Sequence, residues 1–451
     1  MHSSQRIHFI AIGGSVMHNL AIALKEKGYK VTGSDDDIFE PSRSRLEKAG
    51  ILPPSNGWDP NRVTEDLDAV VLGMHAKADN PELIKAQELG LKIYSYPDFI
   101  FENIKDKQRI VIAGSHGKTT ITSMVLHVLK YHNRAFDYVV GAQIEGFDNM
   151  VKLSDAPIIV IEGDEYLTSP LDRTPKFLKY QHHIGLISGI EWDHINVYPT
   201  LEDYVKQFDH FADATPKAGT LIYCEEDDMA TLICNKERED VQRVEYKEHP
   251  SRIENGTTYL LTENGEVPVK VFGRHNMQNL SGAKEVLKKV GVTSDQFYEA
   301  IQTFKGAANR LELLKEKENH AVYKDFAHAP SKLAATTKAL KDQYKDRQLV
   351  ACLELYTFSS LNKAFLAQYQ GTFNAADIAI VYYSPKNLVL KNLETFSAED
   401  VKLAFNRSDL LVFTEIAELK QYLMSLDWNN KNLLMMSSGK FDGLNLHELT
   451  A

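Results

Sequence analysis

The residues best suited to chemistry lie in one short loop, Gly114-Ser115-His116-Gly117-Lys118-Thr119-Thr120, which directly follows the apolar run 109–113. Backbone N–H groups that converge at a helix N-terminus bind anions, and glycines let phosphates come close to them. In such a loop the lysine reaches the β- and γ-phosphates, and the Thr119 hydroxyl ligates Mg²⁺. The spacing GxxGKT is two residues shorter than the common phosphate loop, and an ordinary strand-to-helix turn is the alternative interpretation. We predict a site for a nucleoside triphosphate and Mg²⁺.

Carboxylates gather where two other apolar runs end. Glu162, Asp164 and Glu165 close one run, and Asp193-His194 follow the run 185–190. Ligands of open α/β sheets bind at the carboxyl ends of the strands. Mg²⁺ prefers oxygen, so Glu162 is the natural ligand. His194, taken alone, is more typical of a helix start or a core position.

A second glycine-rich turn, Gly13-Gly14-Ser15, lies between the strand-like run 7–12 and a helical pattern that extends to about Lys27. Similar turns occur in dinucleotide sites, where Asp35 would take the place of the ribose-binding acid. A nicotinamide-dependent oxidoreductase is therefore one alternative, but it leaves the Lys118 loop unexplained.

The elements that position these residues form three α/β patterns. Apolar runs typical of buried parallel strands alternate with helical stretches, and 451 residues favour two to four domains. We expect an α/β protein with a linker at 102–107 and a β-rich excursion at 225–265 that contains a turn at Glu263-Asn264-Gly265. Strands are also expected at 68–72, 92–94, 158–162, 184–188, 321–325, 348–354, 378–383 and 433–437.

Composition excludes several functional classes. A net charge of −11 argues against a nucleic-acid or anionic-membrane partner, which requires a basic face. The three cysteines are too widely spaced for a disulfide framework or a CxxC metal site. No apolar run approaches the roughly 20 residues that cross a bilayer, and the start of the chain lacks a signal-peptide core. We expect a cytoplasmic protein with small-molecule substrates and leave its oligomeric state open.

Taken together, five ordered motifs resemble those of the Mur ligases, the ATP-dependent amide-bond enzymes of peptidoglycan synthesis, and the resemblance covers nearly the whole chain. The motifs are the loop 114–120, the acidic segment 162–165, Glu191-Trp192-Asp193-His194, Gly273-Arg274-His275-Asn276-Met277-Gln278-Asn279, and Arg310 with Asp325-Phe326-Ala327-His328. The resemblance implies a Rossmann-like UDP-sugar domain at 1–106, a P-loop ATP domain at 107–305 and a Rossmann-like acceptor domain at 306–451.

The resemblance also implies roles for individual residues. Catalytic roles fall to Lys118, His194 and His328, although His328 is interpreted equally well as a helix cap. Mg²⁺ ligands are Thr119, Glu162 and His194. The implied ATP contacts are Gly114, Ser115, His116, Gly117, Lys118, Thr119, Thr120, Asn276, Asn279, Arg310 and Asp325.

The first domain is similar to that of Mur ligases that accept UDP-N-acetylmuramate, whose first loop reads roughly GxGGxGM. Val16 stands here where a glycine is usual. The implied UDP-sugar contacts are Gly13, Gly14, Ser15, Asp35, His75 and Asn80.

Two subtypes of the family use this sugar: one adds L-alanine, and one reattaches the whole tripeptide L-Ala-γ-D-Glu-meso-diaminopimelate during peptidoglycan recycling. Asp325-Phe326-Ala327-His328 and the segment 437–443 look more like the tripeptide subtype. Glu354-Leu355-Tyr356 stands where the alanine subtype commonly carries His-Arg-Tyr. Ala329 departs from the second histidine of both subtypes. We therefore favour the tripeptide and keep L-alanine as the alternative.

The implied reaction follows from the chemistry of carboxylates. A carboxylate is a poor acyl donor because its leaving group would be oxide, and transfer of the ATP γ-phosphoryl group gives an acyl-phosphate that an amine can attack. A nucleotide-binding protein without ligase activity is a further alternative. So is a folate polyglutamate ligase, which would lack the UDP-type domain at 1–106.

Overall fold

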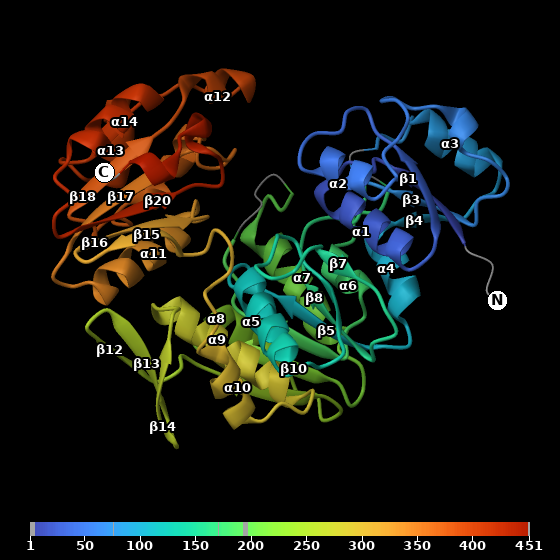
Figure 1. Ribbon diagram of the computed structural model, residues 1–451, viewed down its shortest axis with the longest axis horizontal. Helices are drawn as coiled ribbons and strands as arrows, with labels where there is room; N and C mark the ends of the chain where they lie inside the picture. Colours follow the sequence, from blue (N-terminus) through green and yellow to red (C-terminus); the bar gives the residue numbers. More distant parts are fainter. Residues whose placement is uncertain (1–4, 75, 170, 193–196, 450–451) are drawn as a thin grey trace. The chain divides into compact units, whose positions relative to one another are not determined.

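The computed structural model describes residues 5–74, 76–169, 171–192 and 197–449 (Figure 1). Two compact units are present, each formed by two segments of the chain. The first unit is Met1–Lys247 with Asn279–Ala300, and the second is Glu248–Gln278 with Ile301–Ala451. The division into three domains stays a prediction.

The N-terminal sheet of the first unit is parallel, with strand order β2-β1-β3-β4. Its strands are β1 (Arg6–Ile10), β2 (Lys30–Ser34), β3 (Ala69–Leu72) and β4 (Ile93–Ser95). Its helices are α1 (Ser15–Glu26), α2 (Ser42–Lys48), α3 (Pro81–Glu88) and α4 (Tyr96–Ile104). The linker expected at 102–107 is wrong in its first half, because α4 continues to Ile104 and buries Ile100 and Ile104, one turn apart, in the core.

The central sheet has the order β11-β10-β9-β5-β8-β6-β7, and β7 alone of these strands pairs antiparallel. Its strands are β5 (Gln108–Ala113), β6 (Asp137–Val139), β7 (Val151–Lys152), β8 (Ile158–Glu162), β9 (Ile184–Ile187), β10 (Thr220–Cys224) and β11 (Gln242–Tyr246). Because β5 lies between β8 and β9, the residues that follow these three parallel strands meet at one edge.

Helices of the central part are α5 (Lys118–Tyr131), α6 (Lys176–Lys179), α7 (Leu201–Asp213), α8 (Asp228–Cys234), α9 (Arg274–Lys288) and α10 (Ser294–Ile301). The β-rich prediction for 225–265 is wrong at α8, where the Asp227 side chain caps the helix by accepting from Ala230 N. It is confirmed at the small antiparallel sheet of the second unit, β12 (Ser251–Glu254), β13 (Thr257–Thr262) and β14 (Gly265–Val269). The expected turn connects β13 to β14.

The large sheet of the second unit has the order β15-β16-β20-β17-β18-β19, and the pair β15–β16 is antiparallel. Its strands are β15 (Glu312–Lys317), β16 (His320–Asp325), β17 (Gln348–Glu354), β18 (Ile378–Tyr382), β19 (Leu411–Phe413) and β20 (Lys431–Met436). Its helices are α11 (Pro330–Gln343), α12 (Pro385–Leu390), α13 (Ala398–Phe405) and α14 (Ile416–Ser425). Buried apolar strands between helices confirm the α/β fold class.

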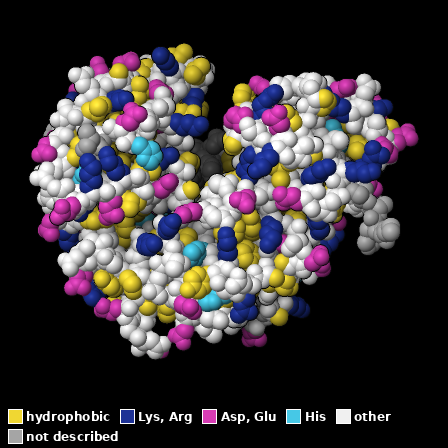
Figure 2. Space-filling view, viewed as in Figure 1, with side chains coloured by type: hydrophobic (Ala, Val, Ile, Leu, Met, Phe, Trp, Pro, Cys, Tyr) yellow, Lys and Arg dark blue, Asp and Glu magenta, His cyan; other side chains and the backbone are white. Residues whose placement is uncertain are grey.

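Basic and acidic side chains are interspersed over the face of the molecule that Figure 2 shows. Among the described residues, no helix is both long and apolar enough to cross a bilayer.

Candidate active site

The loop between β5 and α5 has the backbone that a phosphate site requires. Gly114 has φ +129° and Gly117, the N-cap of α5, has φ +74°, a region that favours glycine. A Cβ atom on Gly114 would overlap Ser188, and one on Gly117 would overlap the Asn279 amide oxygen. Ser115 N donates to Gly189 O at 2.9 Å, which ties the loop to the segment after β9. Both glycines of the motif are therefore needed for the loop conformation.

Lys118 is held at the start of α5 by a buried carboxylate. Its Nζ donates to Glu165 Oε2 at 2.8 Å and to Gly114 O at 2.5 Å. The other oxygen of Glu165 accepts from the Tyr204 hydroxyl at 3.0 Å. Burial alone would lower the pKa of Lys118, but the nearby Glu165, with Asp164 and Glu162, raises it. The ammonium therefore stays charged inside the site.

Thr119 and Glu162 form an oxygen pair next to this lysine. Thr119 Oγ1 donates to Glu162 Oε1 at 2.7 Å, and Gly141 N donates to Glu162 Oε2 at 3.0 Å. Mg²⁺ usually takes only one or two protein oxygens and completes its shell with water and phosphate. The Thr119 hydroxyl at the start of α5 and the Glu162 carboxylate at the end of β8 fit that requirement. Within the described part of the chain, no group of three or more His, Cys, Asp or Glu side chains forms a ready metal site.

His116 and Ser115 contact the segment after β9. His116 Nε2 lies 2.8 Å from Glu191 Oε2, and the His116 carbonyl accepts a hydrogen bond from Ser188 Oγ. Ser115 Oγ accepts from Glu191 N at 2.9 Å and bonds with Tyr204 Oη at the same distance. Thr120 is buried in α5. The structure thus brings the predicted loop next to the acidic segments that end β8 and follow β9, as expected, whereas His194 lies outside the described residues.

Asn276 and Asn279, the two asparagines of the GRHNxxN motif, have different surroundings. The Asn279 amide oxygen lies against Gly117, beside the loop. Asn276 is buried, and its Nδ2 donates to Phe272 O at 2.9 Å. The structure therefore places Asn279 beside the loop that carries Lys118.

The predicted residues of the second unit lie at the end of β16. Asp325 is buried and accepts from Leu311 N at 2.7 Å and from Ala327 N at 2.6 Å. Burial raises the pKa of Asp325, and Arg310 acts in the opposite direction. The Arg310 guanidinium lies over the Phe326 ring at 4.8 Å. His328 Nδ1 lies 2.8 Å from Phe326 O, and the N-cap of α11 is Ala329, so His328 is not the N-cap residue of this helix.

The glycine-rich turn of the N-terminal sheet also brings predicted residues together. Gly13 N donates to Asp35 Oδ2 at 2.7 Å, and α1 begins at Ser15 with Gly14 as its N-cap. Asn80 caps α3, because its Oδ1 accepts from Glu82 N and Leu83 N. His75 lies outside the described residues.

Sequence reasoning missed Tyr204 and Gly141, which fix the two carboxylates of the site. Tyr204 is fully buried, comes from α7 and joins Ser115 to Glu165. Both residues lie far along the chain from the groups they contact. The local sequence around them gives no signal of these contacts.

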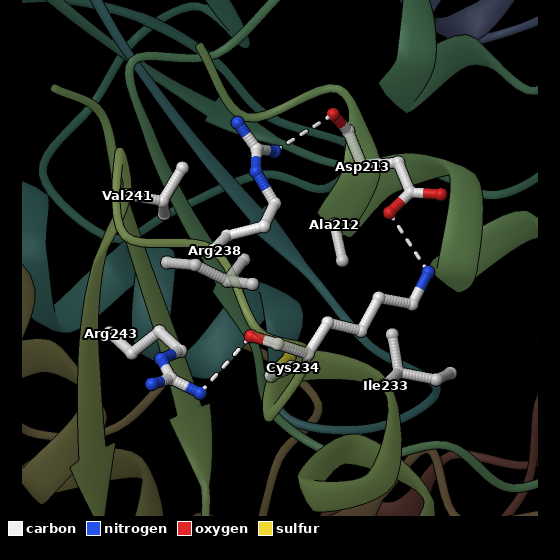
Figure 3. A pocket seen from close by; sticks show the side chains of 9 residues that line it. Ala212, Asp213, Ile233, Cys234, Arg238, Val241 and Arg243 are labelled. Carbon is white, nitrogen blue, oxygen red and sulfur yellow. Dashed lines mark hydrogen bonds and ion pairs between the residues drawn. The ribbon is translucent and has the colours of Figure 1, made fainter. Parts of the chain in front are cut away.

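A surface pocket near β10 and β11 lies apart from these residues (Figure 3). The cationic side chains at this pocket already have partners. Lys236 pairs with Asp209 and Asp213, Arg238 pairs with Asp240, and Arg243 donates to Asn235. Lys236 and Arg238 are therefore paired with carboxylates, whereas Arg243 is hydrogen-bonded to a neutral amide.

Two family models match the chain. Residues 6–108 match "Mur ligase family, catalytic domain", and residues 112–287 match "Mur ligase middle domain". A UDP-N-acetylmuramate–L-alanine ligase from a Sulfurihydrogenibium species is 33% identical over 385 residues, which cover 84% of this chain and 82% of the relative. The chain belongs to the Mur ligase family. The family predicted from five motifs is thereby confirmed.

Other relatives of this Mur ligase carry two different names. The UDP-N-acetylmuramate–L-alanyl-γ-D-glutamyl-meso-2,6-diaminoheptandioate ligase of Haemophilus influenzae is 30% identical over 75% of this chain and 77% of its own length. An alanine ligase structure from Thermotoga maritima has a TM-score of 0.72 at 20% identity, covering 97% of this chain and 96% of its own. A murein peptide ligase structure from Psychrobacter arcticus has a TM-score of 0.65 at 22% identity, covering 98% and 97%. These structures share the α/β fold.

As a Mur ligase, the protein is an ATP-dependent amide-bond ligase of peptidoglycan synthesis that forms ADP and phosphate. Its substrates are small molecules.

Proposed function

We propose that this Mur ligase joins UDP-N-acetylmuramate to the tripeptide L-Ala-γ-D-Glu-meso-diaminopimelate. One observation carries the proposal. Glu354 stands where the alanine-adding subtype commonly has a histidine followed by arginine, and it is buried at the end of β17, bonded to Ser437 and Phe441 of the segment after β20. Both segments differ from the alanine-adding pattern, and they touch each other. The name of the Haemophilus relative, which states this tripeptide, agrees with the proposal.

The reaction we infer has two steps. A carboxylate oxygen of the sugar acid attacks the γ-phosphorus of ATP, the bond to the β-phosphate oxygen breaks, and ADP leaves. The acceptor amine then attacks the carbonyl carbon of the acyl-phosphate, inorganic phosphate leaves, and the nitrogen loses a proton. Phosphoryl transfer of this kind depends on positioning and on neutralisation of charge. Lys118, kept charged by Glu165, and the N–H groups of the loop supply both.

The oxygens of Thr119 and Glu162 would hold Mg²⁺, and the ion would neutralise phosphate charge when bound. We also infer that UDP-N-acetylmuramate binds the domain 1–106 through the turn at Gly13 and Gly14. The hydrogen bond from Gly13 N to Asp35 supports this by fixing the turn and the acid together. ATP then belongs to the domain 107–305 and the acceptor to the domain 306–451.

Addition of L-alanine is the second candidate function. The alanine ligases of Sulfurihydrogenibium and of Carboxydothermus hydrogenoformans, at 33% and 31% identity, favour it. The two candidates share the first substrate and differ only in the amine.

The test measures phosphate release with ATP, Mg²⁺ and UDP-N-acetylmuramate, with either the tripeptide or L-alanine as acceptor. We expect turnover with the tripeptide and at least tenfold lower kcat/KM with alanine, a difference of about 1.4 kcal/mol. A Lys118→Gln variant, which removes the phosphate-binding charge, serves as the blank and is expected to release no phosphate with either acceptor. Turnover with alanine alone would replace the proposal by the second candidate.

A further inference from the structure

Three parallel strands of the second unit end next to one another. β17 pairs with β18 so that Glu354 lies opposite Tyr382, and with β20 so that Leu353 lies opposite Met436. The segments that follow these strands therefore share one edge of the sheet with Glu354. In open α/β sheets this edge is where ligands bind.

Glu354 is a buried carboxylate in which one oxygen accepts hydrogen bonds and the other has no hydrogen-bond partner among the described residues. Glu354 is 1% exposed to solvent. Oε2 accepts hydrogen bonds from Ser437 Oγ and, at 2.9 Å, from Phe441 N. Oε1 is buried and has no hydrogen-bond partner among the described residues, and no Lys or Arg of that part of the chain forms an ion pair with Glu354. An unpaired buried polar atom costs about 1–3 kcal/mol, more if it is charged, so its retention requires an explanation.

The charged groups around Glu354 do not fully compensate a negative charge on its carboxylate. Burial raises the pKa of the Glu354 carboxyl, the hydrogen bonds from Ser437 and Phe441 lower it, and Asp442 raises it further. Lys391, the C-cap residue of α12, acts to lower the pKa of Glu354, but its ammonium donates to Tyr356 O and lies 4.7 Å from the centre of the Tyr356 ring. A ligand cation at Oε1 would therefore relieve both the missing contact and the unfavourable burial of charge.

Two more buried polar atoms at this edge have no partner among the described residues: Ser438 Oγ and Asn387 Nδ2. Ser438 stands between Ser437, which bonds to Glu354, and Gly439. A Cβ atom on Gly439 would lie 2.8 Å from the Tyr356 ring and 2.9 Å from Glu354 Oε2, so the segment packs directly on the carboxylate. Asn387 is one turn before Lys391 in the segment after β18.

Glu354 on one side, and Ser438 and Asn387 on the other, fit ligand groups of opposite charge. A carboxylate with a free oxygen binds an ammonium group, whereas a hydroxyl and an amide N–H next to a lysine bind a carboxylate. Both ligand groups occur together on the zwitterionic end of an amino acid. An ammonium held by Glu354 is protonated and has no lone pair to attack an acyl-phosphate. The bound amine must therefore be a second amine of the acceptor, distinct from the one that reacts.

We propose that Glu354 is a specificity-determining residue that binds the non-reacting ammonium at the distal end of a diamino acceptor, with Ser438 and Asn387 on the adjacent carboxylate. Tyr356 is exposed and its ring lies beside Gly439, and the Lys391 ammonium donates to the Tyr356 carbonyl oxygen. The inference rests on the proposed function and deepens it. It also gives a physical reason for a diamino acceptor, because L-alanine has no second amine.

The first test uses the unaltered enzyme. KM is compared for the tripeptide and for an analogue in which a hydrogen replaces the distal amino group. We expect the analogue to have a KM at least about tenfold higher with a similar kcat, because a charge-assisted contact to a buried carboxylate is lost. Equal KM values for the two acceptors would overturn the inference without any question of misfolding.

The second test uses Glu354→Gln, which keeps an oxygen for Ser437 and Phe441 but removes the charge. We expect its KM for the tripeptide to rise at least about tenfold, with kcat and the KM for ATP within about twofold and with no change in KM for the analogue. Glu399→Gln, at an exposed glutamate of α13, is the matched control. A fall in kcat with unchanged acceptor KM would overturn the inference and make Glu354 a proton acceptor.

The outcomes also separate this inference from the proposed function. If the unaltered enzyme uses only L-alanine, the proposed function fails and takes the inference with it. If the enzyme uses the tripeptide but Glu354→Gln retains its KM, only the inference fails.

Discussion

Single residues of the site are held in place by hydrogen bonds to other residues of the protein. Lys118 is paired with Glu165, and Thr119 with Glu162, so the polar groups predicted to meet phosphate and metal already have fixed directions. Tyr204 holds Glu165 from the other side. Such preorganisation reduces the ordering that a ligand has to impose, because the side chains have already lost their rotamer freedom.

The proposed metal role of Glu162 gives a prediction about magnesium. Glu162→Gln keeps one acceptor oxygen for Gly141 N and can donate its amide N–H to the Thr119 hydroxyl. It loses the negative charge, and we expect the Mg²⁺ concentration for half-maximal activity to rise about tenfold. Phosphate release is measured against Mg²⁺ concentration. Glu202→Gln, at an exposed glutamate of α7, is the control, and an unaltered Mg²⁺ dependence in Glu162→Gln would refute the metal role.

A buried histidine gives a prediction about acid stability. His182 stacks on Phe211 with ring centres 4.2 Å apart and bonds Thr215 at 2.8 Å, and burial, with smaller effects of His183 and Arg109, lowers its pKa to about 3. The histidine is therefore neutral in the folded protein while the unfolded chain takes up a proton below about pH 6.5. The contribution of His182 to the unfolding free energy is fully present above pH 6.5. It falls by up to about 1.4 kcal/mol per pH unit as pH decreases towards 3.

Replacing this group should remove its share of the acid loss. Between pH 7 and pH 4.5 we expect His182→Gln to lose about 2 to 3 kcal/mol less unfolding free energy than the unaltered protein in urea titrations. His210→Gln, at an exposed histidine of α7, should behave like the unaltered protein. Parallel pH profiles for His182→Gln and the unaltered protein would contradict the expected neutral histidine.

At the scale of elements, the loop between β5 and α5 shows how a strand and a helix set the conformation of the residues between them. Gly117 and Gly28 both have left-handed backbones, but only Gly117 has atoms within reach of an added Cβ. Alanine at either position should cost about 1 kcal/mol of stability through backbone strain. Gly117→Ala should in addition displace Asn279 and raise the KM for ATP at least about tenfold. Steady-state kinetics on both variants test this, and an equal ATP KM would exclude a phosphate role for the turn.

Local sequence predicted the elements whose pattern is local. β8 and β17 have the bounds expected from their continuous apolar runs, and α5 ends at Tyr131 as expected. β15 was not predicted, because its charged residues form an edge strand that exists only through pairing with β16. The glycines of the loop were predicted because their pattern is local. The contact of Tyr204 with Glu165, 39 residues away, was not predicted, because no local pattern indicates it.

At the scale of the whole molecule, each compact unit carries a different part of the proposed chemistry. The Lys118 loop belongs to the first unit and Glu354 to the second. The second unit is assembled from two separate segments of the chain, so a boundary drawn at one sequence position does not describe it. α9 begins in one unit and ends in the other. Ligands should therefore act on the stability of the units separately.

This organisation predicts two transitions in differential scanning calorimetry. MgATP at about 100 times its Kd should stabilise the first unit by about 2.7 kcal/mol, because it binds the Lys118 loop in the folded state and not in the unfolded chain. Gly117→Ala should lower the transition of that unit and, with about tenfold weaker binding, reduce the stabilisation by the same MgATP concentration to about 1.4 kcal/mol. Glu354→Gln should raise the transition of the second unit near neutral pH, because the raised pKa of the buried carboxyl makes its ionisation unfavourable in the folded state. That gain should shrink as pH falls and the carboxyl becomes protonated in both states. A single transition that responds to MgATP and to both variants would show that the two units unfold as one.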